Sequence, residues 1–170
     1  MNSNEDAIIS NTFVRRATLS DAFGIHQAHM KSITEICSKD YDEEQIEAWG
    51  NRPYNEESRI EAIKNDYVWV VESNKRIEGY AYLKIFDEHN YGEIWGLYLT
   101  PIVCGKGFGR IIIELIIKEA RKLKLKKIYL SSTKTSKKFY EAAGFKQVGE
   151  DDVTLIRGFE IEGHPMEISL

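Results

Sequence analysis

The sequence predicts an α+β fold of three layers (α/β/α), with a mixed, mostly antiparallel central sheet of six to seven strands and helices on both faces. Two observations predict this class. Short stretches rich in β-branched and aromatic residues alternate with stretches whose apolar residues recur at helical spacing. Some neighbouring strands are joined by short turns, whereas one pair is separated by a long helix and is expected to be parallel.

Length and composition indicate one domain. The chain has 170 residues, 42% hydrophobic and 29% charged, which is typical of an ordered globular protein with a single core. We expect residues 1–11 to form a flexible N-terminus and residues 12–170 to form the domain. No apolar run reaches the ~18–20 residues that a membrane span needs, and residues 1–11 do not resemble a signal peptide. We therefore predict a cytoplasmic protein with no membrane partner.

The first part of the domain is predicted to contain one strand and three helices. Residues 12–17 have the composition of a short strand. Ser20 is predicted to cap the first helix, whose apolar positions continue to Ile36. Asp42 and Asn55 are predicted to cap two shorter helices, because Asp and Asn side chains accept hydrogen bonds from the first free N–H groups of a helix.

Three strands are predicted next. Residues 67–72 and 77–86 are separated by a short polar turn and should form an antiparallel hairpin. Residues 91–99 form the following strand. Gly96 lies inside this strand pattern, which predicts a β-bulge that redirects the residues after it.

The last part combines a glycine-rich loop, two helices and several strands. The helix after the loop is apolar at Ile112, Ile116 and Ala120 and leads to a strand at residues 127–131, which should be parallel to residues 91–99. Thr135 or Ser136 opens a short helix over 137–143 that Gly144 ends. A strand follows at 145–148, and residues 154–159 and 165–168 make one or two closing strands.

The loop at residues 103–110 predicts an anion site. Three glycines in five residues, at positions 105, 107 and 109, allow the backbone to turn tightly and to approach a ligand closely. The first N–H groups of the helix that follows are unpaired and partially positive. Lys106 and Arg110 add full positive charges, so this loop suits a pyrophosphate.

Two common phosphate loops do not fit this segment. A Walker loop requires Ser or Thr after a Gly-Lys pair, but Gly107 follows Lys106. A Rossmann loop requires a glycine at the position of Arg110 and an acidic residue about twenty positions later, where Tyr129 and Leu130 stand.

The charge distribution favours a small polyanionic ligand over nucleic acid. The net charge is −4, which argues against a general nucleic-acid binder. Residues 104–146 nevertheless contain twelve Lys and Arg against three Glu, a balance of +9, so the remainder carries −13.

The two cysteines, Cys37 and Cys104, form neither a disulfide framework nor a zinc site, and we predict no metal.

Three segments in this order resemble the GNAT-type acyltransferases, which move an acyl group from coenzyme A to an amine. They are residues 97–101, residues 104–109 and residues 139–145, and the resemblance spans nearly the whole chain. Residues 41–49 also resemble a bacterial subgroup of acetyltransferases. The chain departs from the family at Cys104, where Arg or Gln is usual, and at residues 132–134, where Asn is common.

The resemblance implies acetyl-CoA as the cofactor and assigns roles to matching residues. Backbone amides of residues 105–110 would hold the pyrophosphate, and Leu97 and Leu99 would pair with the pantetheine as an added strand does. The Leu99 N–H would face the thioester oxygen, and Tyr140 would protonate the departing thiolate. The implied cofactor-binding set is Leu97, Tyr98, Leu99, Gly105, Lys106, Gly107, Phe108, Gly109, Arg110, Ser132, Thr133, Lys137 and Phe139.

The implied reaction also needs a base and an acceptor site. An alkyl amine with a pKa near ~10 must lose a proton before or during attack. Glu93 is the first candidate for the base, with His26 and His29 as alternatives, although Glu93 also fits an ordinary edge carboxylate. The predicted substrate-binding residues are His29, Tyr41, Trp49 and Trp95, of which the three aromatic ones, with Tyr54, could form a wall for a cationic amine.

The sequence leaves the acceptor and the alternatives to catalysis open. A small amine, an antibiotic, an amino acid and a protein lysine or N-terminus all fit as acceptor. A coenzyme A-binding sensor without catalysis is the alternative function. A ligand-free interaction domain fits the glycine loop and the +9 region poorly. The closing strands could also pair across a homodimer.

Overall fold

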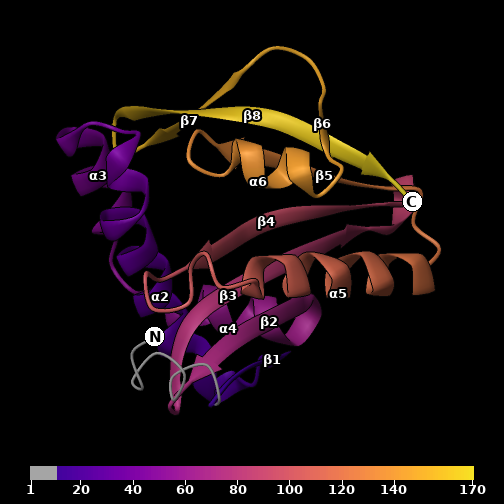
Figure 1. Ribbon diagram of the computed structural model, residues 1–170, viewed down its shortest axis with the longest axis horizontal. Helices are drawn as coiled ribbons and strands as arrows, with labels where there is room; N and C mark the ends of the chain where they lie inside the picture. Colours follow the sequence, from indigo (N-terminus) through magenta and orange to yellow (C-terminus); the bar gives the residue numbers. More distant parts are fainter. Residues whose placement is uncertain (1–10) are drawn as a thin grey trace.

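The computed structural model describes residues 11–170, so the predicted flexible N-terminus lies outside the described residues except for Asn11. A single mixed sheet of eight strands forms the centre of the fold, in the order β1-β2-β3-β4-β5-β8-β6, with β7 paired to β8 (Figure 1). The strands are β1 (Thr12–Arg16), β2 (Tyr67–Ser73), β3 (Arg76–Phe86), β4 (Tyr91–Leu99), β5 (Lys127–Thr133), β6 (Lys146–Gln147), β7 (Asp152–Ile156) and β8 (Phe159–Ser169).

Only β4 and β5 pair in parallel, and every other pairing is antiparallel. The predicted fold class is therefore confirmed. The sheet contains more strands than the six to seven expected because a turn at Arg157 and Gly158, both with positive φ, divides the closing segment into the β7–β8 hairpin. The predicted strand at 154–159 thus contains a turn.

Helices cover both faces of the sheet: α2 (Ala22–Glu35), α3 (Glu43–Gly50), α4 (Glu56–Asn65), α5 (Phe108–Lys122) and α6 (Lys137–Ala142). The alternation of β2 shows how the faces are divided. Trp69 and Val71 pack with the apolar side of α5, whereas Val68 and Val70 pack with Ile25 of α2 on the opposite face. Figure 1 shows α5 and α6 on one side of the sheet, and α3 beside the far end of β8.

The caps of the two short helices are confirmed. Asp42 Oδ1 accepts a hydrogen bond from Gln45 N at 2.9 Å, and Asn55 Oδ1 accepts one from Ser58 N at 3.0 Å. Gly144 follows Ala143, the C-cap residue of α6. The φ of Gly144 is +96°, a backbone conformation that favours glycine.

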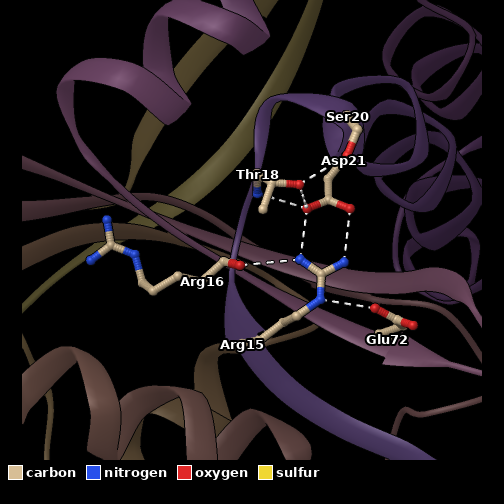
Figure 2. Close-up of polar contacts among 6 residues, drawn as sticks. All are labelled: Arg15, Arg16, Thr18, Ser20, Asp21 and Glu72. Atoms are coloured by element: carbon tan, nitrogen blue, oxygen red, sulfur yellow. Dashed lines mark hydrogen bonds and ion pairs between the residues drawn. The ribbon is translucent and has the colours of Figure 1, made fainter.

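The predicted cap of the first helix at Ser20 is wrong. A 3₁₀ turn at Leu19–Asp21 precedes α2, and Thr18 and Asp21 form the capping box that starts it. The Thr18 N–H donates to Asp21 Oδ2 at 2.7 Å, while Ser20 Oγ lies 2.9 Å from Thr18 Oγ1 (Figure 2).

Asp21 takes this role because Arg15 fixes its carboxylate. Figure 2 shows the Arg15 guanidinium in two hydrogen bonds to Asp21, at 2.7 and 2.9 Å, while its Nε donates to Glu72 Oε2 at 2.8 Å. Burial by itself raises the pKa of Asp21, but the hydrogen bonds from Arg15 and Thr18 outweigh burial and hold this pKa below 3.8. The cluster joins β1, β2 and the start of α2.

The predicted β-bulge in β4 is confirmed. Tyr82 pairs with Gly96 and Leu83 pairs with Ile94, so Trp95 is the extra residue on β4. A β-carbon on Gly96 would stand 2.6 Å from the Tyr80 hydroxyl oxygen, which explains why a glycine stands here.

Within residues 11–170, no helix combines the length and the apolar character that crossing a membrane requires.

Candidate active site

The site lies where β4 and β5 separate. Their parallel ladder ends at the pair Ile94 and Leu130. Beyond it β4 continues along β3 as far as Leu99, while β5 continues along β8 as far as Thr133. The edge of β4 from Trp95 to Leu99 therefore faces an opening in the sheet instead of a strand.

One cavity of about 500 Å³ lies at this opening, and its wall also includes Ser32, Ile36 and Cys37 at the end of α2. It brings together the edge of β4, the glycine loop and α6, as the resemblance implied. The predicted cofactor residues on its wall are Leu97, Tyr98, Leu99, Gly105, Gly107, Gly109, Arg110, Thr133 and Phe139. Three segments far apart in the sequence thus line one continuous hollow.

The open edge of β4 offers unpaired N–H groups. Thr100 N donates to Glu78 O of the β3 side at 2.8 Å. Because successive N–H groups of a strand point to opposite edges, the N–H of Leu99 and that of Leu97 point toward the opening. Both groups are placed to pair with an extended ligand or to meet a thioester oxygen.

The loop glycines are required for two different reasons. Gly105 and Gly107 have φ of +73° and +90°, and nothing would lie within 4 Å of a β-carbon at either position. Their left-handed backbone is what selects glycine. Gly109 is limited by space, because its β-carbon would stand 3.1 Å from the ring of Phe139.

Four predicted cofactor residues lie elsewhere. Lys106 is exposed and is not on the cavity wall, and the Phe108 side chain is buried in the core. Lys137 also lies off the wall. Ser132 lines the second cavity described below, and its hydroxyl donates to Thr133 O at 2.8 Å. The Phe108 side chain is thus turned into the core, whereas the exposed Lys106 side chain stays free to reach a phosphate at the loop.

Tyr140 lines the first cavity, which is called the cofactor-side cavity from here on, and 4% of its surface is exposed. The rings of Phe139 and Phe145 pack edge-on against it, with centroids 5.1 and 5.5 Å away. Burial raises the pKa of Tyr140 above its ordinary value of 10. The phenol therefore keeps its proton across the neutral range, so its O–H is available as a hydrogen-bond and proton donor.

A second cavity, of about 460 Å³, adjoins the first at the opening. It contains Glu93, His29, Trp49 and Trp95 from the predicted set, together with Arg52 and residues of β7 and β8. The two cavities share the residues at the separation of the strands, namely Ile94, Trp95, Tyr98, Ser131 and Thr133. They therefore meet at one point in the sheet.

Glu93 lies on the second cavity because of its place in β4. Ile94 is buried in the core with α5, so its neighbour Glu93 points to the other face. The carboxylate is half-buried at the end of the ladder, beside the shared residues. His26, the alternative base, lies on neither wall and packs near Tyr54 at 5.3 Å between ring centroids.

His29 is buried, and its surroundings keep it neutral. Burial, followed by the charges of Arg59 and Arg52, lowers the pKa of His29 well below 6.5. Its Nδ1 lies 2.8 Å from Arg59 Nη2 and 3.1 Å from the Tyr80 hydroxyl.

Tyr41, predicted for the acceptor wall, is held by hydrogen bonds to two other segments. Its hydroxyl donates to Glu162 O at 2.7 Å and accepts from Lys134 N at 2.9 Å, and Tyr41 lines neither cavity. It ties the α2–α3 connection to β8 and to the start of the α6 loop. Trp49 packs edge-on against Tyr41 and does reach the second cavity.

Sequence reasoning missed the part of the wall that Arg52, Thr154, Ile161 and Glu162 supply. Arg52 follows α3 and belongs to no recognisable motif. The other three lie on the β7–β8 hairpin. Its strand β8 pairs with β5, which is distant in the sequence. The one local signal was the turn at Gly158.

Comparisons with known proteins agree with this geometry. The model of the acetyltransferase (GNAT) family matches residues 30–145. An amino-acid acetyltransferase of Neisseria meningitidis is 30% identical over 131 residues, which are 76% of this chain and 28% of that protein. The chain thus spans little more than a quarter of the length of this curated relative.

Solved structures share the fold. The GCN5-related N-acetyltransferase of Rhodopseudomonas palustris superposes with a TM-score of 0.82 at 21% identity, covering 94% of this chain and 96% of that one. The PaiA N-acetyltransferase of Thermoplasma acidophilum, solved in complex with coenzyme A, gives 0.77 at 21% identity, covering 94% and 99%. The fold is thus the one shared by these solved N-acetyltransferases. The chain belongs to the acetyltransferase (GNAT) family.

Proposed function

We propose that this protein transfers an acetyl group from acetyl-CoA to a primary amine by direct attack of the amine on the thioester. The observation that carries the proposal is the meeting of two cavities at the separation of β4 and β5. One has the glycine loop and the open strand edge. The other has a carboxylate at the same point.

Each chemical step has a candidate residue. The acceptor reacts as the free amine, after its ammonium form has lost one proton to solvent, and its nitrogen attacks the thioester carbonyl carbon. Glu93, directly or through a water, accepts the proton that the nitrogen loses as the new carbon–nitrogen bond forms. The Leu99 N–H stabilises the negative charge that develops on the carbonyl oxygen. The carbon–sulfur bond breaks, and Tyr140 gives its proton to the departing thiolate. The products are an amide and coenzyme A, and the two protein groups exchange their protons with solvent.

Coenzyme A would lie along the first cavity. Its diphosphate would accept hydrogen bonds from the backbone of residues 105–110, and its pantetheine would pair with Leu97 and Leu99. Among the described residues, no observation favours a coenzyme A sensor over an enzyme.

We also propose a cellular compartment and an oligomeric state. Cys37 and Cys104 are free thiols, which supports a reducing compartment such as the cytoplasm. On β7, Val153 and Leu155 are 53% and 69% exposed, which supports a homodimer through the closing hairpin.

Thiol release from acetyl-CoA, measured across a panel of amines, tests the function. We expect release that depends on one class of amine and is accompanied by an acetylated product in equal amount. Binding of coenzyme A without release in the presence of any amine would contradict catalysis and restore the sensor.

A further inference from the structure

The guanidinium of Arg52 lines the second cavity, which is called the acceptor-side cavity from here on. Arg52 follows α3, is half-buried, and uses its Nε to donate to Trp49 O at 3.0 Å. Within residues 11–170, no carboxylate forms an ion pair with Arg52 or with Arg59. Arg52 on the cavity wall and Arg59, whose Nη2 lies 2.8 Å from His29 Nδ1, therefore carry two positive charges that no protein carboxylate pairs with in residues 11–170.

His29 adds a hydrogen-bond donor to the same end. Arg59 has only donors, so the His29 Nδ1 that lies 2.8 Å from Arg59 Nη2 must be the acceptor. The proton of the neutral imidazole is then on Nε2. This atom is buried, and it has no hydrogen-bond partner among the described residues. His29 is 8% exposed and lines the cavity.

Carboxylates lie at other positions on the same wall. Glu93 stands beside the residues shared with the cofactor-side cavity, where an amine must reach the thioester. Glu162 also lines the acceptor-side cavity, but Lys134 forms an ion pair with it. The cavity thus has an acidic group near the thioester and an unbalanced basic group at Arg52.

We propose that Arg52, beside the unsatisfied Nε2–H of His29, binds a carboxylate of the acceptor, so that the acceptor is a small amino acid carrying both a free amine and a free carboxylate. This inference rests on the proposed acetyl transfer. A guanidinium presents paired N–H donors that match a carboxylate, and the bound anion would balance the charges of Arg52 and Arg59. A small polyamine fits poorly, because its second ammonium would face these two charges. The cationic acceptor expected from composition is therefore replaced by a zwitterion.

Matched pairs of acceptors test the anchor. Each neutral amino acid is compared with its own carboxamide, which keeps the amine and removes the carboxylate, and kcat/KM is measured by thiol release. We expect the preferred acid to exceed its amide by at least about tenfold, the effect of one charge-assisted contact. Arg52→Gln should remove most of this ratio, and Arg52→Lys should retain part of it. Arg121→Gln, the same change on the exposed last turn of α5, should leave the ratio unchanged.

A binding measurement separates this inference from the proposed function. Propionate and propionamide are titrated into the coenzyme A complex, and tryptophan fluorescence is recorded because Trp49 and Trp95 line the cavity. We expect propionate to bind more tightly than propionamide, and Arg52→Gln to remove this difference. Arg52-dependent propionate binding without transfer to any amine would support the anchor and overturn the proposed function. Transfer with equal kcat/KM for acids and amides would overturn the anchor and leave the proposed function standing.

Discussion

Ile94 pairs with Leu130 at the last step of the β4–β5 ladder, and past this pair the two strands follow different partners. The Trp95 bulge comes immediately afterwards, so the free edge of β4 begins at the point where the ladder ends. Tyr140 lines the first cavity and Glu93 lines the second, and the two cavities share residues at this opening. The proposed acid and the proposed base therefore belong to two adjoining cavities that meet where the strands separate.

Replacing Tyr140 with Phe removes the proposed acid while keeping the ring. We expect kcat to fall by ~10²-fold or more, with coenzyme A affinity within about twofold of the wild type. The control is Tyr129→Phe, which removes a hydroxyl from β5 outside both cavities. A Tyr140→Phe enzyme with nearly wild-type kcat would exclude Tyr140 as the acid.

Replacing Gly107 with Ala tests the loop. At φ of +90° a side chain is strained by roughly 1–2 kcal/mol, so the loop should relax and coenzyme A should bind at least about tenfold more weakly. Gly158→Ala is the matched control, because Gly158 has φ of +87° and equally open surroundings in the β7–β8 turn. It should lose comparable stability yet bind coenzyme A normally. Equal losses of affinity in both variants would show that the loop has no special role.

Replacing Asp21 with Asn tests the cluster that joins β1, β2 and α2. The variant leaves Arg15 with a neutral partner, and we expect the free energy of unfolding to fall by about 2 kcal/mol at neutral pH. The Asp21 side chain is 8% exposed, in contrast to the Arg110–Glu114 pair, whose side chains are 84% and 65% exposed. Glu114→Gln should therefore cost less than about 0.5 kcal/mol in the same denaturant titration.

The loss in Asp21→Asn should depend on pH. Because the folded pKa of Asp21 lies below 3.8, the stabilisation is present above that value and is lost as the pH falls through the folded pKa. The difference between wild type and variant should shrink in this acidic window. A difference that stays constant down to the acid transition would contradict the role of the ionised carboxylate.

His29 should affect stability in a higher pH range. Its folded pKa is well below 6.5, so below 6.5 the unfolded chain takes up a proton that the folded protein does not. Stability is full above 6.5 and should fall by up to about 1.4 kcal/mol per pH unit below it, a slope that His29→Gln reduces. NMR of the imidazole should show a neutral ring at about pH 5.5. A His29 titration with a midpoint near 6.5 would refute this assignment.

Local signals in the sequence were sufficient for most of the fold. Asp42 and Asn55 cap helices by bonding to N–H groups three residues away, and Gly96 marks a bulge because Tyr80 leaves no room for a β-carbon. Such features depend on neighbours in the chain or on one strand partner. The prediction of Ser20 as the cap was wrong because Arg15, six residues before Asp21, donates hydrogen bonds to the Asp21 carboxylate and holds it in the capping position.

The candidate site was predictable only in part. The glycine loop was predicted because its chemistry lies in the backbone, whereas the role of the β4 edge came from the resemblance at residues 97–101. The sequence did not indicate that the hydroxyl groups of Tyr41 and Ser132 bond to Glu162 O and Thr133 O. Arg52 was missed because its role depends on α3 packing near β8, a long-range contact with no local sequence signal.

The central claim is that the opening between β4 and β5 holds the acyl-carrying thiol. Amide hydrogen exchange with and without coenzyme A tests it most directly. We predict slower exchange at the N–H groups of Leu97 and Leu99 and at residues 105–110, with little change in the β7–β8 turn. Tight binding that leaves these amides unprotected would contradict the account.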